Sequence, residues 1–457
     1  MEYSPNCTIT YSTKNNLIYE KVLSYTLYSY ENVKKISLTE VSSLQLLVQK
    51  FGGTSVQTKE NRLHVMKQIK RALKKNYKLV VVVSALGRSP DPYATDTLIK
   101  MVNYPELNNN SKRELDMLMS CGETIASVIL SNELQNSNIS ATALTGAQAG
   151  LITNDEYNEA KIKKVKPDRI IHELKTHDVV VVAGFQGRTE TGDITTIGRG
   201  GSDTTAVAFG AALQAECVEI FTDVNGIMTA DPRVVDAAKP IDIVTYTEIS
   251  NLAYQGAKVI HPRAVEIAMQ AKIPIRIRST YLEDPGTLIT SSREQEIGID
   301  IPDRLVTGIA HIDAITQIHV PIKETALDDQ AIIFQTMADA GISVDFINIS
   351  PSHVLYTVPD DVADHAAKLL KEKDFTVDLT KSCAKVSAVG AGMTGIPGVT
   401  AKIMNALVKN NVQILQSADS HTTIWVLIRD EHLKVAVNAL HEAFELNKVG
   451  EKLVSNR

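Results

Sequence analysis

The sequence predicts an α/β fold: a mainly parallel sheet sandwiched by helices, followed by two smaller βαββαβ-like units. First, apolar runs alternate with helical stretches from residue 46 to about 290. Second, these runs have no polar face, which is typical of strands buried between two layers of helices. Third, the strands come in closer succession after residue 305. The strand candidates of the first region include 79–84, 178–184 and 217–222, and its helical stretches include 60–76 and 112–136.

Length and composition bound the class of protein. A chain of 457 residues exceeds one ordinary core and predicts two to four domains. A net charge of −6 with 44% hydrophobic residues gives no reason to expect a nucleic-acid or membrane partner. The four cysteines are far apart and form no Cys/His cluster, so we expect no disulfide framework and no protein metal site. A reducing cytoplasm fits this cysteine usage.

The chain divides into four predicted segments. Residues 1–44 form a polar, tyrosine-rich stretch without the apolar core of a signal peptide, and we expect a poorly ordered extension. The main α/β domain is expected over 45–300, and the two smaller units over 301–383 and 384–450.

The first polar motif follows the strand that begins at residue 46. Lys50 is followed by Gly52, Gly53, Thr54 and Ser55. Glycines let backbone N–H groups approach an anion, and a lysine beside them supplies a point charge for phosphate. An ordinary strand-to-helix turn is the alternative for such a pair of glycines.

Two further polar positions follow the second strand. Thr95 opens a helix after a loop, where it is either a helix N-cap or a ligand-contacting hydroxyl. Glu123 follows Gly122 inside a helical pattern, and a mid-helix glycine costs about 1 kcal/mol, so it asks for a packing or functional reason. A carboxylate there would pair with an ammonium group, unless it lies on a solvated helix face.

The run 195–205 contains three glycines. Arg199 can grip a carboxylate with two hydrogen bonds, and Gly201, Ser202 and Asp203 stand where a small-residue helix is predicted over 204–215. A helix start with this composition is a site for an anion. Ser202 and Asp203 could equally be plain helix caps.

Two later stretches complete the set. Thr222 and Asp223 follow a strand, and Met228 and Arg233 follow in the same loop, which also carries the turn signals of a simple surface loop. Lys258 lies in a Gly-Ala-Lys-Val-Ile-His-Pro stretch, where an exposed helix lysine is the alternative.

The second region holds strands and helices in the order of two βαββαβ units. Its run 390–395 formally matches GxGxxG, but the next strand turns at 419–421 straight into another strand. Such a tight connection must be antiparallel, so a dinucleotide site is not expected. The predicted strands are 306–312, 315–321, 342–349, 353–358, 375–379, 384–389, 411–417 and 422–428, and the helices 327–340, 361–373, 398–410 and 431–445.

These motifs together resemble the aspartokinases of the amino-acid kinase superfamily. The resemblance rests on KFGGTSV, GRGGSD, TDVNGIMTADPR and GAKVIHP, and extends to about residue 447. It implies the amino-acid kinase fold followed by tandem ACT domains, with the strand at 306–312 joining the second ACT unit. It also implies ATP- and Mg²⁺-dependent phosphorylation of the β-carboxylate of L-aspartate, the first step of lysine, threonine and methionine biosynthesis.

The resemblance assigns a role to each motif residue. Lys50, Arg199 and Asp203 are the expected catalytic residues, and no protein ligand to the metal is expected. The aspartate contacts are expected from Thr95, Glu123, Arg199, Gly201 and Ser202. The nucleotide contacts are expected from Lys50, Gly52, Gly53, Thr54, Ser55, Thr222, Asp223, Met228, Arg233 and Lys258. Many relatives have tyrosine at the position of Met228, so ring stacking on adenine is not available there.

Regulation is implied by the same resemblance. Asp345 and Ser350 match effector-contacting positions, and the feedback effector would be meso-diaminopimelate, lysine or threonine. The motifs are most similar to diaminopimelate-sensitive members. A homodimer or larger assembly through the ACT domains is expected. Two alternatives remain open: another amino-acid kinase, such as an acetylglutamate or glutamate 5-kinase, and an ACT-based amino-acid sensor without catalysis.

Overall fold

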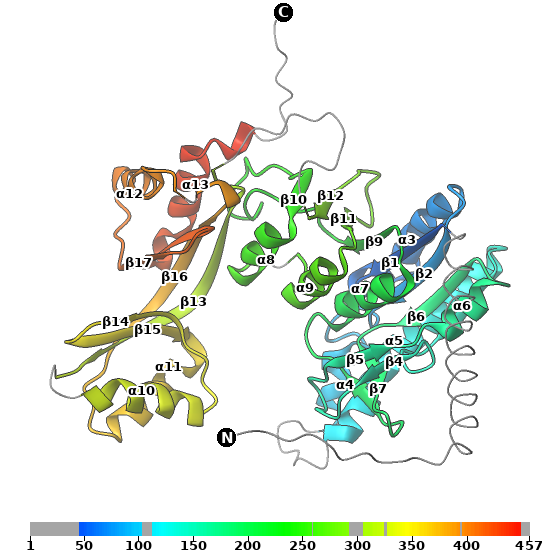
Figure 1. Ribbon diagram of the computed structural model, residues 1–457, viewed down its shortest axis with the longest axis horizontal. Helices are drawn as coiled ribbons and strands as arrows, with labels where there is room; N and C mark the ends of the chain where they lie inside the picture. Colours follow the sequence, from blue (N-terminus) through cyan, green and yellow to red (C-terminus); the bar gives the residue numbers. More distant parts are fainter. Residues whose placement is uncertain are drawn as a thin grey trace, which may run out of the picture.

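The computed structural model describes residues 45–102, 112–257, 259–291, 305–323, 327–393 and 395–448. The predicted extension 1–44 and Lys258 lie outside the described residues. The described chain forms two bodies, one built from elements β1 to β12 and the other from β13 to α13 (Figure 1). None of the described helices has the length and hydropathy needed to cross a bilayer.

The main sheet of the first body has eight strands in the order β10-β12-β11-β9-β1-β2-β6-β3. All neighbouring pairs are parallel except β11 and β12, so the predicted mainly parallel sheet is confirmed. The strands are β1 (Leu46–Phe51), β2 (Lys78–Val83), β3 (Ala141–Leu144), β6 (Val179–Ala183), β9 (Cys217–Thr222), β10 (Ile243–Thr245), β11 (Ile275–Ser279) and β12 (Thr287–Thr290).

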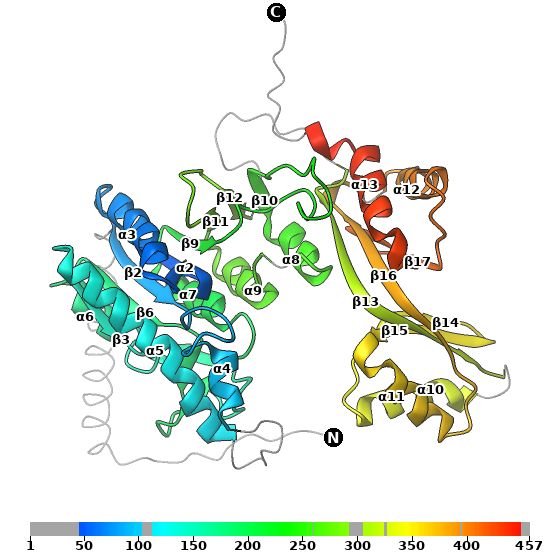
Figure 2. The same ribbon diagram turned by 180° about the vertical axis from the view of Figure 1, so that it is seen from behind.

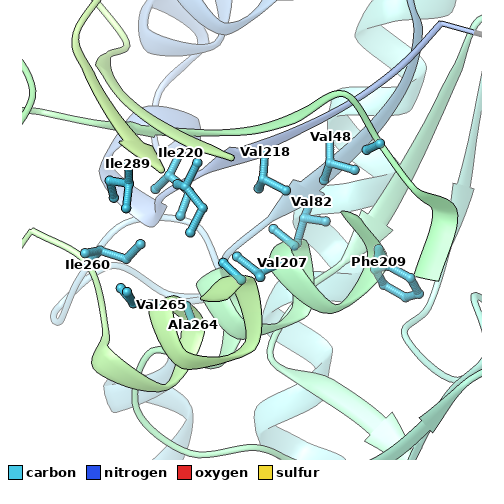
Figure 3. Close-up of a cluster of buried hydrophobic side chains, with 14 of the residues drawn as sticks. Val48, Val82, Val207, Phe209, Val218, Ile220, Ile260, Ala264, Val265 and Ile289 are labelled. Carbon is cyan, nitrogen blue, oxygen red and sulfur yellow. The ribbon is translucent and has the colours of Figure 1, made fainter. Parts of the chain in front are cut away.

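Helices cover both faces of this sheet. In β2, Val81 packs in a buried cluster with residues of α3 and α5, whereas Val82 packs on the opposite face with residues of α7 and α9 (Figure 3). Because successive side chains of a strand point to opposite faces, an all-apolar strand needs a helix layer on each side. The helices are α2 (Gly53–Val56), α3 (Lys59–Leu73), α4 (Thr95–Lys100), α5 (Lys112–Asn136), α6 (Asp168–Leu174), α7 (Gly201–Leu213), α8 (Tyr246–Tyr254) and α9 (Pro262–Ala271).

A second, four-stranded sheet in this body was not predicted. Its order is β5-β4-β7-β8, and its strands are β4 (Leu151–Thr153), β5 (Ile162–Val165), β7 (Gln186–Arg188) and β8 (Ile194–Thr196). Strands of three or four residues are too short to reveal a period in the sequence.

The second body contains one six-stranded sheet in the order β14-β15-β13-β16-β18-β17. Four predicted strands are wrong as separate elements: 306–312 and 315–321 form one long strand, as do 375–379 and 384–389. The apparent breaks are positions of positive φ, Ala314 at 53° and Ser382 at 55°. Register shifts occur around Ile315, but pairing between the two strands resumes on either side. A bulge therefore interrupts the sequence pattern without ending the strand.

The two long strands serve both halves of this body. Gly308–Ile312 pair with Lys385–Val389, and Val306 and Ile309 lie in the core that packs against α12 and α13. The strands are β13 (Gly308–Pro321), β14 (Asp345–Ile349), β15 (His353–Pro359), β16 (Asp378–Val389), β17 (Gln416–Asp419) and β18 (Thr423–Arg429). The helices are α10 (Leu327–Asp339), α11 (Asp360–Lys371), α12 (Val399–Lys409) and α13 (Leu433–Ala443), with short 3₁₀ turns at Ala391–Met393, Asp430–His432 and Leu446–Lys448.

The antiparallel connection that excluded a dinucleotide site is confirmed. β17 and β18 are joined by a tight turn and pair antiparallel, from Gln416 opposite Leu427 to Asp419 opposite Ile424. The strand was predicted to begin at residue 411, but β17 begins at Gln416.

The two bodies meet where α8 lies beside β13 and β16, as both views show (Figures 1 and 2). Asn251 donates to the hydroxyl of Thr422 over 2.7 Å, and Ser387 donates to the side chain of Gln255 over 3.1 Å. Ala310 and Val389 pack in a hydrophobic core of the first body. The contact is therefore a packed interface with specific hydrogen bonds.

Candidate functional site

A cavity of about 640 Å³ lies beside the carboxyl ends of β1, β2 and β6. This is the edge where ligands bind in parallel α/β sheets. Eight of the predicted site residues line it: Lys50, Gly53, Thr95, Glu123, Arg199, Gly201, Ser202 and Asp203.

The glycine loop after β1 is packed directly against the loop after β2. A Cβ on Gly53 would lie 2.7 Å from the carbonyl oxygen of Ala85 and 2.8 Å from that of Gly87. The backbone N–H of Gly87 also donates to the carbonyl of Gly53 over 3.0 Å. Only glycine at position 53 allows these two loops to form one wall of the cavity.

Lys50 forms an ion pair with Asp203 across the cavity, with 2.7 Å between Nζ and Oδ1. Both side chains are mostly buried, at 13% and 12% exposed. Nζ also lies over the glycine loop, 3.7 Å from where a Cβ on Gly52 would stand. The pair therefore holds the lysine ammonium group at the floor of the cavity, beside backbone N–H groups.

The helix after the glycine run begins earlier than predicted. α7 starts at Gly201, its N-cap is Gly200 with φ of 67°, and no side chain caps it. The interpretation of Ser202 and Asp203 as helix caps is therefore wrong, because both lie in the first turn. This turn leaves backbone N–H groups without helical partners and adds the positive end of the helix dipole to the Lys50 side of the cavity.

Glu123 is a buried carboxyl group in the cavity wall and is only 2% exposed. Its Oε1 accepts a hydrogen bond from the backbone N–H of Ala85 over 3.2 Å. Its Oε2 has no hydrogen-bond partner in the described part of the chain, and burial raises the pKa of this carboxyl group to about 8. A buried acceptor without a partner is costly, and a cationic group in the cavity would satisfy it.

Arg199 and Thr95 also line this cavity. Arg199 is exposed and has no ion-pair partner among the described residues, so its guanidinium is available to a carboxylate. The helix-cap interpretation of Thr95 is wrong, since the N-cap of α4 is Ala94 and Thr95 is the first helical residue.

Asp116 is a buried residue of the site that the sequence analysis missed. Its carboxylate accepts from the N–H of Asn158 over 3.1 Å, and from the N–H and hydroxyl of Thr196 over 3.0 and 2.5 Å. Burial raises the pKa of Asp116. The residue thus ties α5 to the end of β8 and to the loop of Asn158, which lines the cavity. The available signal was its position two helical turns before Glu123, on the same face of α5.

We predict that Asp116→Ala lowers the free energy of unfolding by about 3 kcal/mol, because it leaves several buried donors without an acceptor. Urea titration of the full chain measures the change. Asp155→Ala, at an exposed position of the neighbouring loop, is the control and should change stability by less than about 0.5 kcal/mol. Equal effects of the two substitutions would contradict this role.

Apart from Lys50 and Gly53, none of the described residues expected at the nucleotide lines this cavity. The hydroxyl of Ser55 is fully buried and lies 2.7 Å from that of Thr280, whose N–H donates to the carbonyl of Thr222. These contacts bring the ends of β1, β9 and β11 together, next to the glycine loop. Gly52, Thr54, Thr222 and Asp223 therefore lie on this neighbouring edge of the sheet, and Asp223 is exposed.

Met228 and Arg233 lie further along the same loop. Met228 is half-buried and pairs with Pro240 through an isolated β-bridge. Arg233 is exposed, and its guanidinium bonds both oxygens of Asp231, which lowers the pKa of that carboxyl group. Arg233 would have to leave Asp231 to reach a phosphate.

The two expected effector residues lie in the second body. Asp345 is 64% exposed and forms an ion pair with Lys385, whose side chain is only 4% exposed. The hydroxyl of Ser350 lies 2.9 Å from Nδ1 of His353. Neither residue is near the cavity of the first body.

Across the described ranges, no three His, Cys, Asp or Glu side chains gather in a way that could hold a metal ion. This part of the chain therefore offers no protein cage for a divalent cation.

Comparisons with known proteins agree over most of the chain. The amino acid kinase family matches residues 45–279, and an ACT domain matches residues 378–442. Aspartokinase 1 of Bacillus subtilis is 57% identical over 405 residues, which span 89% of this chain and 100% of that protein. The aspartokinase of Geobacillus stearothermophilus is 39% identical over 409 residues, 88% of this chain and 97% of that protein.

Solved structures give the same result. Aspartokinase III of E. coli in complex with aspartate and ADP superposes with a TM-score of 0.68 at 26% identity, covering 87% of this chain and 99% of that one. The aspartate kinase of Clostridium acetobutylicum superposes with a TM-score of 0.70 at 25% identity, covering 88% and 100%.

Proposed function

The chain belongs to the aspartokinase family and is an aspartate kinase, and we propose that its cavity binds L-aspartate through Glu123 and Arg199 while ATP occupies the neighbouring edge of the sheet. The observation that carries this proposal is that Oε2 of Glu123 and the guanidinium of Arg199 share one cavity, and neither has a partner among the described residues. One complements an ammonium group and the other a carboxylate, the two charged groups that every amino acid presents.

The second carboxylate of aspartate would lie toward Lys50. Ser202 and the N–H groups of the first turn of α7, including that of Gly201, are available to it, and Thr95 would close the opposite side. A dicarboxylic amino acid therefore fits this cavity. Glu123 would bind its ammonium group, Arg199 would bind one carboxylate, and Lys50 with the first turn of α7 would bind the other.

The reaction forms one bond and breaks one. An oxygen of the β-carboxylate attacks the γ-phosphorus of ATP, and the bond to the bridging oxygen of ADP breaks, giving 4-phospho-L-aspartate. The attacking carboxylate is already ionised at neutral pH, so no general base is required. Lys50 and the N–H groups of Gly52 and Gly53 would offset the charge on the transferred group, while Asp203 fixes the lysine.

ATP would lie over the glycine loop and the segment from Thr222 to Arg233. Thr54, Ser55, Thr222 and Asp223 border that edge, and Lys258 is expected to approach the phosphates. The lack of a protein cage in the described residues fits a Mg²⁺ ion that the nucleotide phosphates carry. When bound, this ion neutralises charge on the β- and γ-phosphates.

Trapping of the acyl phosphate with hydroxylamine tests the proposal. The purified full chain is incubated with ATP, Mg²⁺ and either L-aspartate, L-glutamate or N-acetylglutamate. We expect hydroxamate from L-aspartate alone. Hydroxamate from N-acetylglutamate or L-glutamate would indicate another amino-acid kinase activity. The absence of product with all three substrates would favour an amino-acid sensor without catalysis.

Feedback control is proposed to act through Asp345 and Ser350, with meso-diaminopimelate, lysine or threonine as the effector. Lysine bound to aspartokinase III of E. coli supports an amino-acid effector of this class. Here Lys385 already places an ammonium group against Asp345. An effector ammonium would therefore compete with an internal one, which limits affinity.

We predict that Lys385→Met lowers the concentration of effector needed for half-inhibition by about tenfold, because Asp345 loses its internal partner. Inhibition of hydroxamate formation is measured for each of the three candidate effectors. Lys381→Met is the matched control, since it removes an exposed ion pair with Asp364 from the same strand. A weaker response of Lys385→Met to every effector would contradict the competition.

Assembly is proposed to use the ACT region. β14 and β17 are the outer strands of the six-stranded sheet, and Ile347 and Ile349 on β14 are about half exposed. Open strand edges with apolar side chains favour pairing with another chain. A homodimer or larger assembly is therefore expected.

A further inference from the structure

Part of the loop that carries the proposed nucleotide residues Met228 and Arg233 packs into the core of the second body. Ala230 and Val235 are buried in the hydrophobic cluster that also contains Val437 and Leu440 of α13. The side chain of Asn438 donates to the carbonyl of Val234 over 3.0 Å. The loop between β9 and β10 is therefore packed against a helix from the ACT region, far along the chain.

Thr229 in this loop is fully buried and forms hydrogen bonds with three other residues. Its N–H donates to the carbonyl of Lys239, and its carbonyl accepts from the N–H of Ile309, each over 2.8 Å. Its hydroxyl accepts from the N–H of Lys239 over 2.9 Å and lies 2.9 Å from Nε2 of His441. Thr229 thus joins the loop, β13 and α13.

His441 and the hydroxyl of Thr229 share one hydrogen bond, in which the tautomer of the imidazole decides the donor. The hydroxyl can accept from the N–H of Lys239 and still donate its own proton to Nε2. That pairing requires the neutral imidazole with its ring proton on Nδ1. His441 is only 2% exposed, and burial lowers its pKa, which favours this neutral form.

We propose that His441 is a positioning residue for the nucleotide, supplied to the kinase reaction by the ACT region. The inference rests on the proposed function, since Met228 and Arg233 are the proposed nucleotide contacts on either side of Thr229. Fixing Thr229 fixes Met228, its neighbour in sequence, and the turn that carries Arg233. The loop is then held in the geometry that ATP needs before ATP arrives.

The effect is specific to one substrate. None of the described residues that line the aspartate cavity comes from the segment 224–241. Displacing this loop should therefore weaken ATP binding and leave aspartate binding almost unchanged. A purely structural role would affect both substrates together.

Two substitutions test the inference in the full chain. His441→Phe and Thr229→Val each remove one side of the hydrogen bond, and each is expected to raise the Kd of Mg·ATP and the KM for ATP about tenfold. The KM for aspartate should change by less than about twofold. His441→Gln, which keeps an acceptor near the position of Nε2, should restore most of the ATP affinity. Val435→Ala, at an exposed position of the same helix, is the control.

The outcomes separate the inference from the proposed function. Unchanged ATP affinity in a folded Thr229→Val protein would overturn the inference, as would an equal rise in both KM values. Calorimetric titration with Mg·ATP does not depend on turnover. A wild-type chain that binds ATP but forms no hydroxamate would contradict the proposed function. The Kd values of the variants for Mg·ATP would still decide the role of His441.

Discussion

Replacing Lys50 with alanine is expected to lower kcat for hydroxamate formation about 10³-fold. The substitution removes the cation that lies over the glycine loop, and it leaves Asp203 as an unpaired, mostly buried carboxylate beside the transferred phosphoryl group. An unpaired buried negative charge would also repel ATP. Steady-state kinetics with saturating ATP and aspartate measure the loss.

Lys78→Ala is the matched control for this prediction. Lys78 is also on a strand of the main sheet and forms an ion pair of 2.9 Å with Asp178, at the opposite end of the neighbouring strand β2. Its loss should leave kcat within about twofold, because this partly exposed pair lies at the end of the strand away from the cavity. The Lys50→Ala protein should still bind the effector. A decrease in kcat of less than about tenfold would show that Lys50 does not stabilise the transferred group.

The second large effect concerns Glu123 and pH. Burial raises the pKa of Glu123 to about 8, so the group is mainly neutral at pH 7 in the free protein. Only the ionised form attracts the substrate ammonium group strongly. The KM for aspartate should therefore fall as pH rises from about 6 to about 8, by up to about tenfold for each pH unit, and then level off.

Stability should respond to pH in the opposite direction. The folded pKa of Glu123 lies above its unfolded value, so the contribution to stability is fully present below the unfolded pKa and is lost as pH rises through about 8. Aspartate binding should offset this loss. Thermal unfolding with and without aspartate at several pH values measures both effects.

Glu123→Gln keeps the shape of the side chain but cannot ionise. It should raise the KM for aspartate about 100-fold at pH 9 and abolish the dependence of KM on pH between 6 and 8. Glu114→Gln, at an exposed position of the same helix, is the control. If the KM of Glu123→Gln keeps the wild-type pH profile, the titrating group is not Glu123.

Local chemistry predicted much of the site. The second glycine after β1, the Arg-Gly-Gly-Ser-Asp run and Glu123 are predicted from residue types next to apolar runs, and the structure brings them into one cavity. Their position follows from a general property of parallel sheets, whose carboxyl ends meet at one edge. The prediction that Ser202 and Asp203 are helix caps is wrong. The helix α7 starts at Gly201 because Gly200 adopts a left-handed backbone conformation, which composition does not reveal.

The sequence by itself determined the fold class, the family and the residue types of the site, because strand periodicity and motif spacing are local properties. Only the tertiary structure showed that two long strands join both ACT-like halves in one sheet. Only it showed the contacts of Asp116 with Thr196, of Lys385 with Asp345 and of Thr229 with His441. Each contact joins residues at least 40 positions apart, as in the pair of Lys385 and Asp345. Burial strengthens these contacts, because a buried polar group without a partner is costly. Burial depends on how distant segments of the chain pack, and no local sequence pattern encodes that packing.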